Sequence, residues 1–261
     1  MKMTELPRFD DVNVSLSDHV AVVEIARPPH NFFDFDLIGN LATAFEALGE
    51  TDACRAIVLC AQGKSFCAGA NFGSGDQLDQ DRRPGQLYVE AVRLFRTPKP
   101  VVAAIQGAAI GGGLGLAMVG DFRVACPEAR FAANFTRLGF HPGFGLTVTL
   151  PEVIGKTKAA LMFYTSRRIK GEEALALGLA DVLVPQAELR EAAIGLAREI
   201  AECSPLGVVA TRATMRQGLA DRVKAATDHE LEQQEWLRGT ADFQEGVKAV
   251  SERRVPNFQG R

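Results

Sequence analysis

Two glycine-rich segments hold the strongest candidates for residues that bind a ligand or take part in catalysis. Ser65-Phe-Cys-Ala-Gly-Ala-Asn71 follows one apolar stretch, and Gln106-Gly-Ala-Ala-Ile-Gly-Gly-Gly113 follows another. Small residues let a ligand approach the backbone closely, and N–H groups at the start of a helix carry partial positive charge. Two such donors converging on one oxygen would form an oxyanion hole. The same glycines could equally serve only tight turns and helix packing, and their spacing does not decide between these interpretations.

The sequence does not match the common motifs for phosphate binding, nucleophilic catalysis or metal binding. Gly63-Lys64-Ser65 looks like the end of a P-loop, but Val58 stands where that motif needs its first glycine. The glycines from 111 to 115 lack dinucleotide-binding spacing, because Met118 occupies the last glycine position. No nucleophile elbow of the GxSxG type exists, and the four histidines are widely separated. We therefore expect no metal site.

Predicted strands and helices alternate along the chain and flank the two glycine-rich segments. Strands are predicted at 20–26, 55–61, 101–105, 122–126 and 181–184, and helices at 37–49, at 87–95 and from Gly113 to Met118. This alternation is typical of an α/β domain with parallel strands. Both glycine-rich segments leave a predicted strand at its carboxyl end, where open α/β sheets place their ligands.

The last part of the chain has an almost purely helical pattern. Leu189, Ala193, Leu196 and Ile200 form one apolar stripe, and Ser204-Pro205 predicts the cap of the next helix. We divide the chain into a core domain, residues 1–200, and a helical region, residues 201–261. The second part is too short to hold much core alone, so we expect it to pack on the main domain or on another subunit.

The bulk composition narrows the class of protein. The chain has 261 residues, of which 25 are glycines. Its formal net charge is −3, and no basic stretch is interleaved with aromatic residues, so a nucleic-acid partner is not expected. Five cysteines without CxxC spacing indicate a reducing compartment, and the N-terminus has no apolar signal core. Pro100–Gly120 is uncharged and long enough to span a bilayer, but its small residues and Gln106 favour a buried strand and helix. We expect a cytoplasmic protein without membrane insertion.

Five segments together resemble the crotonase superfamily, the enoyl-CoA hydratases and isomerases, over nearly the whole chain. Ser65–Asn71 is similar to the first signature of that family. Further similarities lie at Pro98–Gly107 with Gly111–Ala117, at Leu138–Gly139 with Pro142–Gly145, at Ala174–Ala180 and at Asp242–Phe258.

The resemblance implies an α/β fold, a crotonase-like spiral of ββα units with a C-terminal helical oligomerisation region, assembled as homotrimers or hexamers. It also implies an acyl-CoA substrate of the kind found in fatty acid metabolism, with no cofactor beyond the CoA of that thioester. Its carbonyl would be held by the backbone amides of Ala70 and Gly112, beside Gly69 and Gly111, and the carbonyls around Ala68 would face the adenine. Arg27, and Arg253 from a neighbouring subunit, are candidates for the CoA phosphates, with surface salt bridges as the alternative for each.

The chain departs from the hydratases at the positions where they carry two catalytic glutamates, which here read Gly115 and Phe135. Because positioned acid/base groups contribute about 10²–10⁴-fold each, standard hydration should be severely impaired. His141 is our candidate replacement, since imidazole titrates near neutrality. Asn134 and Thr136 could orient water, and Asp121 is interpreted as structural.

The aromatic residues Phe135, Phe140 and Phe144 would make the acyl pocket apolar. Two classes of function then stay open. One is isomerisation, decarboxylation or hydrolysis assisted by His141. The other is a catalytically silent acyl-CoA-binding protein that retains only the oxyanion hole and the oligomer interface.

Overall fold

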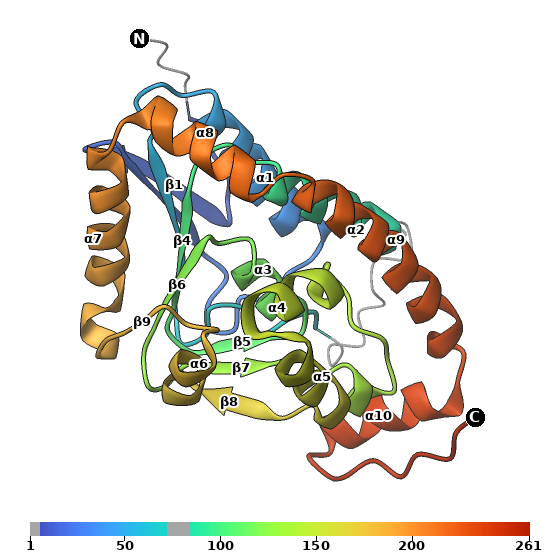
Figure 1. The fold of residues 1–261 in the computed structure, drawn as a ribbon. Helices are drawn as coiled ribbons and strands as arrows, with labels where there is room; N and C mark the ends of the chain where they lie inside the picture. The colour runs from blue at the N-terminus through green and yellow to red at the C-terminus, as the bar shows by residue number, and fades with distance from the viewer. Residues whose placement is uncertain (1–5, 72–83) are drawn as a thin grey trace.

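A six-stranded sheet forms the centre of the computed structural model, which describes residues 6–71 and 84–261 (Figure 1). The strand order is β1 (Val12–Ser17), β2 (Val20–Ile25), β3 (Ala56–Ala61), β4 (Val101–Ile105), β6 (Phe122–Ala125) and β9 (Val182–Leu183). From β2 onward neighbouring strands are parallel, as the alternating sequence pattern predicts. Strand β1 pairs antiparallel with β2 and was not among the predicted strands.

Both faces of the central strands β3 and β4 are buried, so these strands are continuous apolar runs, whereas β1 at the edge alternates between buried and more exposed residues. On one face Ile57 and Leu59 of β3 join the main core with α1 (Phe35–Gly49) and α2 (Pro84–Phe95). On the other face Ala56 and Val58 pack against α7 (Leu189–Glu202), whose apolar stripe the sequence predicted.

A second sheet of three short strands lies below the first in Figure 1 and is built from β5 (Ala108–Ile110), β7 (Arg130–Ala132) and β8 (Arg168–Lys170). Strands β5 and β7 are parallel, and β7 and β8 are antiparallel. The expected loop at 106–113 is therefore interrupted by a strand, because Ala108–Ile110 pairs with β7. The buried helix α3 (Gly112–Ala117) follows at once.

The remaining elements surround this second sheet or form the C-terminal part of the chain. They are the 3-10 turns η1 (Thr136–Leu138) and η2 (Gln186–Glu188), and the helices α4 (Leu146–Ile154), α5 (Lys156–Thr165), α6 (Gly171–Leu177), α8 (Pro205–Met215), α9 (Leu219–Arg238) and α10 (Ala241–Ser251). No helix in the described ranges is long and apolar enough to cross a membrane. The uncharged stretch at 100–120 forms β4, β5 and α3 instead.

The helical C-terminal region returns to the main domain of the same chain. Ser204 caps α8, with its side chain accepting a hydrogen bond from the Gly207 backbone and Pro205 in the first turn, as predicted. Helix α9 packs along α2, and α10 packs against η1. Asp121 pairs with both Arg212 and Arg216 of α8 and also accepts a hydrogen bond from the Val101 backbone, which matches its interpretation as structural. The boundary at residue 200 stays a prediction.

Candidate functional site

The two glycine-rich segments are brought together by a short parallel pairing beyond the ends of β3 and β4. The Cys67 N–H donates to the Ala108 carbonyl at 2.9 Å, and the Ile110 N–H donates to the Cys67 carbonyl at 3.1 Å. Cys67 is thereby in register with Ala109. Three residues further along each segment stand Ala70 and Gly112, so the pairing delivers both to the same edge.

Two glycines are required by the closeness of this crossing rather than by their backbone angles. A Cβ atom on Gly113 would lie 2.1 Å from the Cys67 carbonyl oxygen, and one on Gly107 would lie 2.0 Å from the Lys64 carbonyl oxygen. No side chain fits at such distances. Part of the glycine excess therefore serves to let one glycine-rich segment lie directly on the other.

The backbone N–H groups around the crossing are mostly occupied. Ala68 donates to the His30 carbonyl at 3.0 Å, and Gly111 donates to the Ala132 carbonyl at 2.8 Å. Within residues 6–71 and 84–261, however, no oxygen accepts a hydrogen bond from the N–H of Ala70 or of Gly112. Both residues line one cavity of about 950 Å³. Two backbone donors without an acceptor among the described residues therefore belong to residues that line a space able to hold a ligand.

Nine of the residues expected from the sequence to bind substrate or to do chemistry line this cavity, which we call the main cavity. They are Arg27, Ala68, Gly69, Ala70, Gly111, Gly112, Phe135, Phe140 and Phe144. His30 and Asn134 also line it. Arg253 lies elsewhere, exposed at the end of α10 with a positive φ of 56°. Thr136 is used structurally, because its hydroxyl donates to the Phe163 carbonyl at 2.6 Å and lies 2.8 Å from the Ser166 hydroxyl.

His141, the candidate replacement for the missing glutamates, does not line the main cavity. It lines a second cavity of about 860 Å³, together with Trp236 and Tyr164, and its Nδ1 lies 2.8 Å from the Pro142 carbonyl oxygen. Only Phe140, of the aromatic residues expected in the acyl pocket, lines both cavities. The role of His141 as acid or base stays a prediction.

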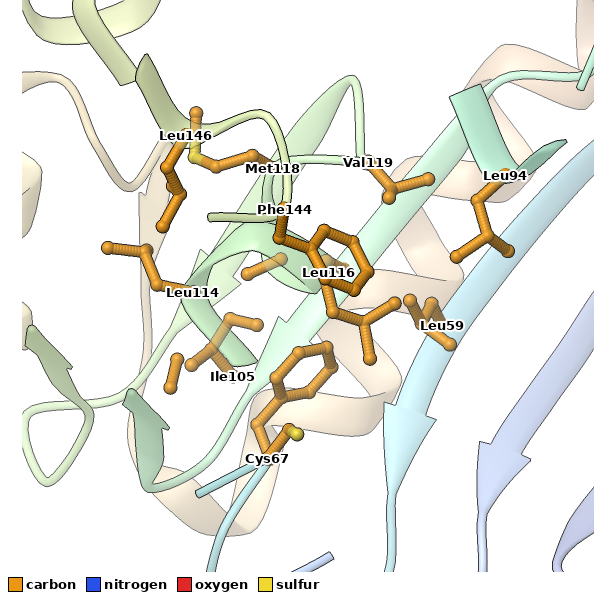
Figure 2. Packing of buried hydrophobic residues seen from close by; sticks show 14 of the residues in the cluster. Leu59, Cys67, Leu94, Ile105, Leu114, Leu116, Met118, Val119, Phe144 and Leu146 are labelled. Atoms are coloured by element: carbon orange, nitrogen blue, oxygen red, sulfur yellow. The ribbon is translucent and has the colours of Figure 1, made fainter. Parts of the chain in front are cut away.

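The space around Gly115 is filled by an aromatic ring. A Cβ atom on Gly115 would lie 2.6 Å from Cβ and 2.8 Å from Cγ of Phe144. The Phe144 side chain is 1% exposed and belongs to the same buried cluster as Leu116 and Cys67 (Figure 2). A glutamate at position 115 would meet this ring. The packing of Phe144 therefore leaves no space for a glutamate side chain at position 115.

Groups on α2 and α9 hold the segment that carries Phe144. Phe144 has a positive φ of 63°, a conformation that is uncommon for a bulky residue. The buried carboxylate of Glu230 accepts hydrogen bonds from the N–H groups of Gly145 at 2.8 Å and Thr147 at 3.1 Å. Burial raises the pKa of Glu230 above its ordinary value, although these hydrogen bonds act in the opposite direction. Gln234 adds a hydrogen bond of 3.0 Å to the His141 carbonyl.

Charged side chains divide into paired and unpaired groups around the main cavity. Asp34 is the one carboxylate among the described residues that line it, and it is occupied as the cap of α1 and as a partner of Arg27 at 2.5 Å. Arg27 also pairs with Asp11 at 2.5 Å. These bonds match the alternative that Arg27 serves in salt bridges, and they leave no described carboxylate in the cavity free for proton transfer.

Four cations that line the cavity were missed by the sequence reasoning: Lys64, Arg130, Arg168 and Arg238. Lys64, Arg130 and Arg168 are exposed, and none of the three has an ion pair within the described part of the chain. Arg130 and Arg168 lie on the same face of the second sheet, because Arg168 is paired with Ala132, two residues beyond Arg130. That face could be found only from the pairing of β7 with β8.

Comparisons with known proteins identify the family and the fold of the chain. The family model for enoyl-CoA hydratase/isomerase matches residues 15–261. A probable enoyl-CoA hydratase of Bacillus subtilis (strain 168) is 33% identical, over 95% of this chain and 98% of the relative. A crotonyl-CoA hydratase of Syntrophomonas wolfei is 31% identical, over 96% and 98%. The crystal structure of an enoyl-CoA hydratase/isomerase from Pseudoalteromonas atlantica T6c, 28% identical, superposes with a TM-score of 0.87 over 96% of this chain and 100% of that one. The chain belongs to the enoyl-CoA hydratase/isomerase family, the crotonase superfamily, and has its fold.

Proposed function

We propose that the protein binds an acyl-CoA thioester and stabilises the enolate of its acyl group between the N–H groups of Ala70 and Gly112. The observation that carries this proposal is the register of Cys67 with Ala109, which brings two donors without a described acceptor to one cavity. Donors fixed in advance at the developing oxyanion are the largest single contribution in many enzymes. Losing one such donor costs about 2.7–4 kcal/mol in known cases.

The exposed cations at the mouth of the cavity fit the CoA part of this substrate. Lys64, Arg130 and Arg168 offer positive charge without ion pairs in the described residues, next to the loop that begins with Ala68. Arg27 is already bound by two carboxylates, so its contribution to phosphate binding is smaller. Arg253 stays a weaker candidate for a CoA phosphate, offered from a neighbouring subunit of a trimer or hexamer.

The reaction we favour is not hydration of a 2-enoyl-CoA. Gly115 and Phe135 replace the expected glutamates, and Phe144 fills the space above Gly115. Isomerisation, decarboxylation or hydrolysis would each use the oxyanion hole without that pair of carboxylates. His141, if it serves as the acid or base, acts from the side of the second cavity.

A catalytically silent acyl-CoA-binding protein is the second candidate, and one observation favours it. No described carboxylate in the main cavity is free of a structural partner. This function would need only the two backbone donors and the cationic mouth of the cavity.

A panel of acyl-CoA thioesters, incubated with the purified protein and followed by mass spectrometry, separates these functions. We expect turnover of at least one thioester and crotonyl-CoA hydration near background. Hydration at tens of turnovers per second would contradict the argument from the missing glutamates. Binding without any turnover would favour the silent binder, and a His141→Ala variant with unchanged turnover would remove the histidine from the mechanism.

A further inference from the structure

Arg238 is a half-buried cation in the wall of the main cavity. It is the last residue of α9, and its guanidinium carbon lies 4.8 Å from the centroid of the Phe140 ring and 6.0 Å from that of the Phe243 ring. Phe140, Phe135 and Phe144 line the same cavity. Arg238 therefore lies among the aromatic residues of the expected acyl pocket, apart from the exposed cations of the second sheet.

The guanidinium of Arg238 has no hydrogen-bond acceptor or ion pair among the described residues. Its Nε atom is shielded from solvent and has no partner there. Partial burial is the main influence on the pKa of Arg238 and lowers it, while the charges of Tyr88 and Glu235 act in the opposite direction. Shielding a charged group from water without a partner costs free energy, and proteins normally pair such groups.

The comparison with Arg27 shows what Arg238 lacks. Both arginines line the main cavity, but Arg27 is held by Asp11 and Asp34, each at 2.5 Å. The described lining of the cavity offers no carboxylate other than Asp34, so the anion that would pair with Arg238 is not supplied by those residues.

Two polar side chains of the same cavity wall, Tyr88 and Gln234, have their donors occupied, so the guanidinium of Arg238 is the donor that an anion would meet there. The Tyr88 hydroxyl donates to Gln234 Oε1 at 2.9 Å, and both residues line the cavity. Gln234 is held in turn by its hydrogen bond to the His141 carbonyl. A carboxylate at the guanidinium would meet a pre-organised, planar donor that suits its geometry and is less strongly hydrated than an ammonium group.

We propose that the acyl group of the substrate ends in a carboxylate, which pairs with Arg238 while the thioester carbonyl lies at Ala70 and Gly112. This inference rests on the proposed acyl-CoA function and names the class of its substrate: CoA thioesters of dicarboxylic acids. The ligand supplies a negative charge that the described cavity wall does not offer to Arg238, and the Phe140 and Phe243 rings shield one side of the guanidinium from water, which strengthens the pair.

Isothermal titration of the full-length protein with glutaryl-CoA and with pentanoyl-CoA tests the inference, because the two thioesters have the same chain length and differ in the terminal carboxylate. We expect wild-type protein to bind glutaryl-CoA about tenfold more tightly or better. Arg238→Met should abolish or reverse this preference, and Arg238→Lys should keep part of it. Arg222→Met is the matched control: Arg222 lies on the same helix, pairs with Glu152 and lines neither cavity, so its preference should equal that of wild type.

The outcomes separate the two proposals. Equal affinity of the wild-type protein for both thioesters overturns the carboxylate assignment and leaves the acyl-CoA function intact. Binding of neither thioester overturns both. A preference that persists in Arg238→Met places the carboxylate elsewhere, and the wild-type preference remains a test even if that variant does not fold.

Discussion

The two walls of the main cavity are built on different principles. One wall is backbone: Ala70 and Gly112 are placed by main-chain pairing, and glycines at 107 and 113 permit the crossing. The other wall is built from side chains: Phe144 packs against Gly112 and Gly115 of α3, and Arg238 ends α9, which packs along α2. The first wall offers backbone N–H donors of the kind that stabilise an enolate. The second wall lacks the two glutamates that the hydratases use to add water. We infer from this difference that the backbone donors proposed as an oxyanion hole do not depend on the side chains of the opposite wall.

The largest effect is expected from breaking the backbone wall with Gly113→Ala. Its Cβ atom would meet the Cys67 carbonyl oxygen at 2.1 Å. We expect a loss of about 3 kcal/mol or more in the free energy of unfolding, seen as a fall of about 6 °C or more in Tm, together with loss of acyl-CoA binding.

Gly195→Ala is the matched control for that substitution. Gly195 lies within α7 with nothing near its Cβ position, so alanine should add about 0.5–1 kcal/mol of stability. A Gly113→Ala variant as stable as wild type would contradict the description of the crossing.

The second test restores a carboxylate to the other wall with Gly115→Glu. Because Cβ would meet Phe144 at 2.6 Å, we expect a loss of about 1–3 kcal/mol of stability and no gain in hydration. Gly115→Ala should lose similar stability and serves as the control for the ring contact. An increase of about 10²-fold in crotonyl-CoA hydration by Gly115→Glu would show that the space is open after all.

The third test loosens the support of the side-chain wall with Glu230→Gln. The change leaves a donor of Gly145 or Thr147 without a good acceptor, at a cost of about 1–3 kcal/mol at neutral pH.

The pH dependence of that cost has a defined sign. Since burial raises the pKa of Glu230 above its ordinary value of 4.5, the native protein takes up this proton before the unfolded chain does. The advantage of wild type over Glu230→Gln should therefore grow as the pH falls from neutral towards 4.5 and shrink as the pH rises through the raised pKa. Thermal unfolding of both proteins across this range measures it, and a difference independent of pH would mean that the pKa is not raised.

The smallest effect is expected at the exposed mouth of the cavity. Arg168→Gln should weaken CoA binding by about two- to fivefold, because an exposed ion pair contributes only about 0.2–1 kcal/mol. Lys170, at the other end of the same short strand, does not line either cavity, so Lys170→Gln is the control. The loss should diminish at high salt, and equal losses in both variants would indicate a diffuse electrostatic effect instead.

The sequence predicts the backbone wall better than the side-chain wall. The long apolar strands at 56–61 and 101–105 and the glycine-rich segments beside them are local signals, and they led to Ala70 and Gly112. Strands β5, β7 and β8 have three residues each, too few for a period, and two of them carry exposed arginines. Their pairing creates the cationic face that the sequence reasoning missed.

The side-chain wall depends on contacts between distant parts of the chain. Arg238 lies in a charged helix, and only the packing of α9 along α2 brings it to the cavity. His141 and Phe144 are three residues apart, yet they line different cavities: Pro142 lines the second cavity with His141, and Gly143 lines the main cavity with Phe144. No local sequence pattern indicates this change from one cavity to the other.

The most direct test of the central claim removes one backbone donor and follows the thioester carbonyl. Gly112 is the first residue of α3, where proline is tolerated, but any Cβ there would meet the Phe33 ring at 2.4 Å. Phe33→Ala with Gly112→Pro therefore removes the N–H, and Phe33→Ala with Gly112→Ala keeps it. Infrared spectra of bound butyryl-CoA labelled with carbon-13 at the carbonyl should show the band displaced to lower wavenumber in the alanine variant and largely restored towards its solution position in the proline variant. The same band position in both variants, with both saturated by ligand, would contradict the assignment of Gly112 to the oxyanion hole.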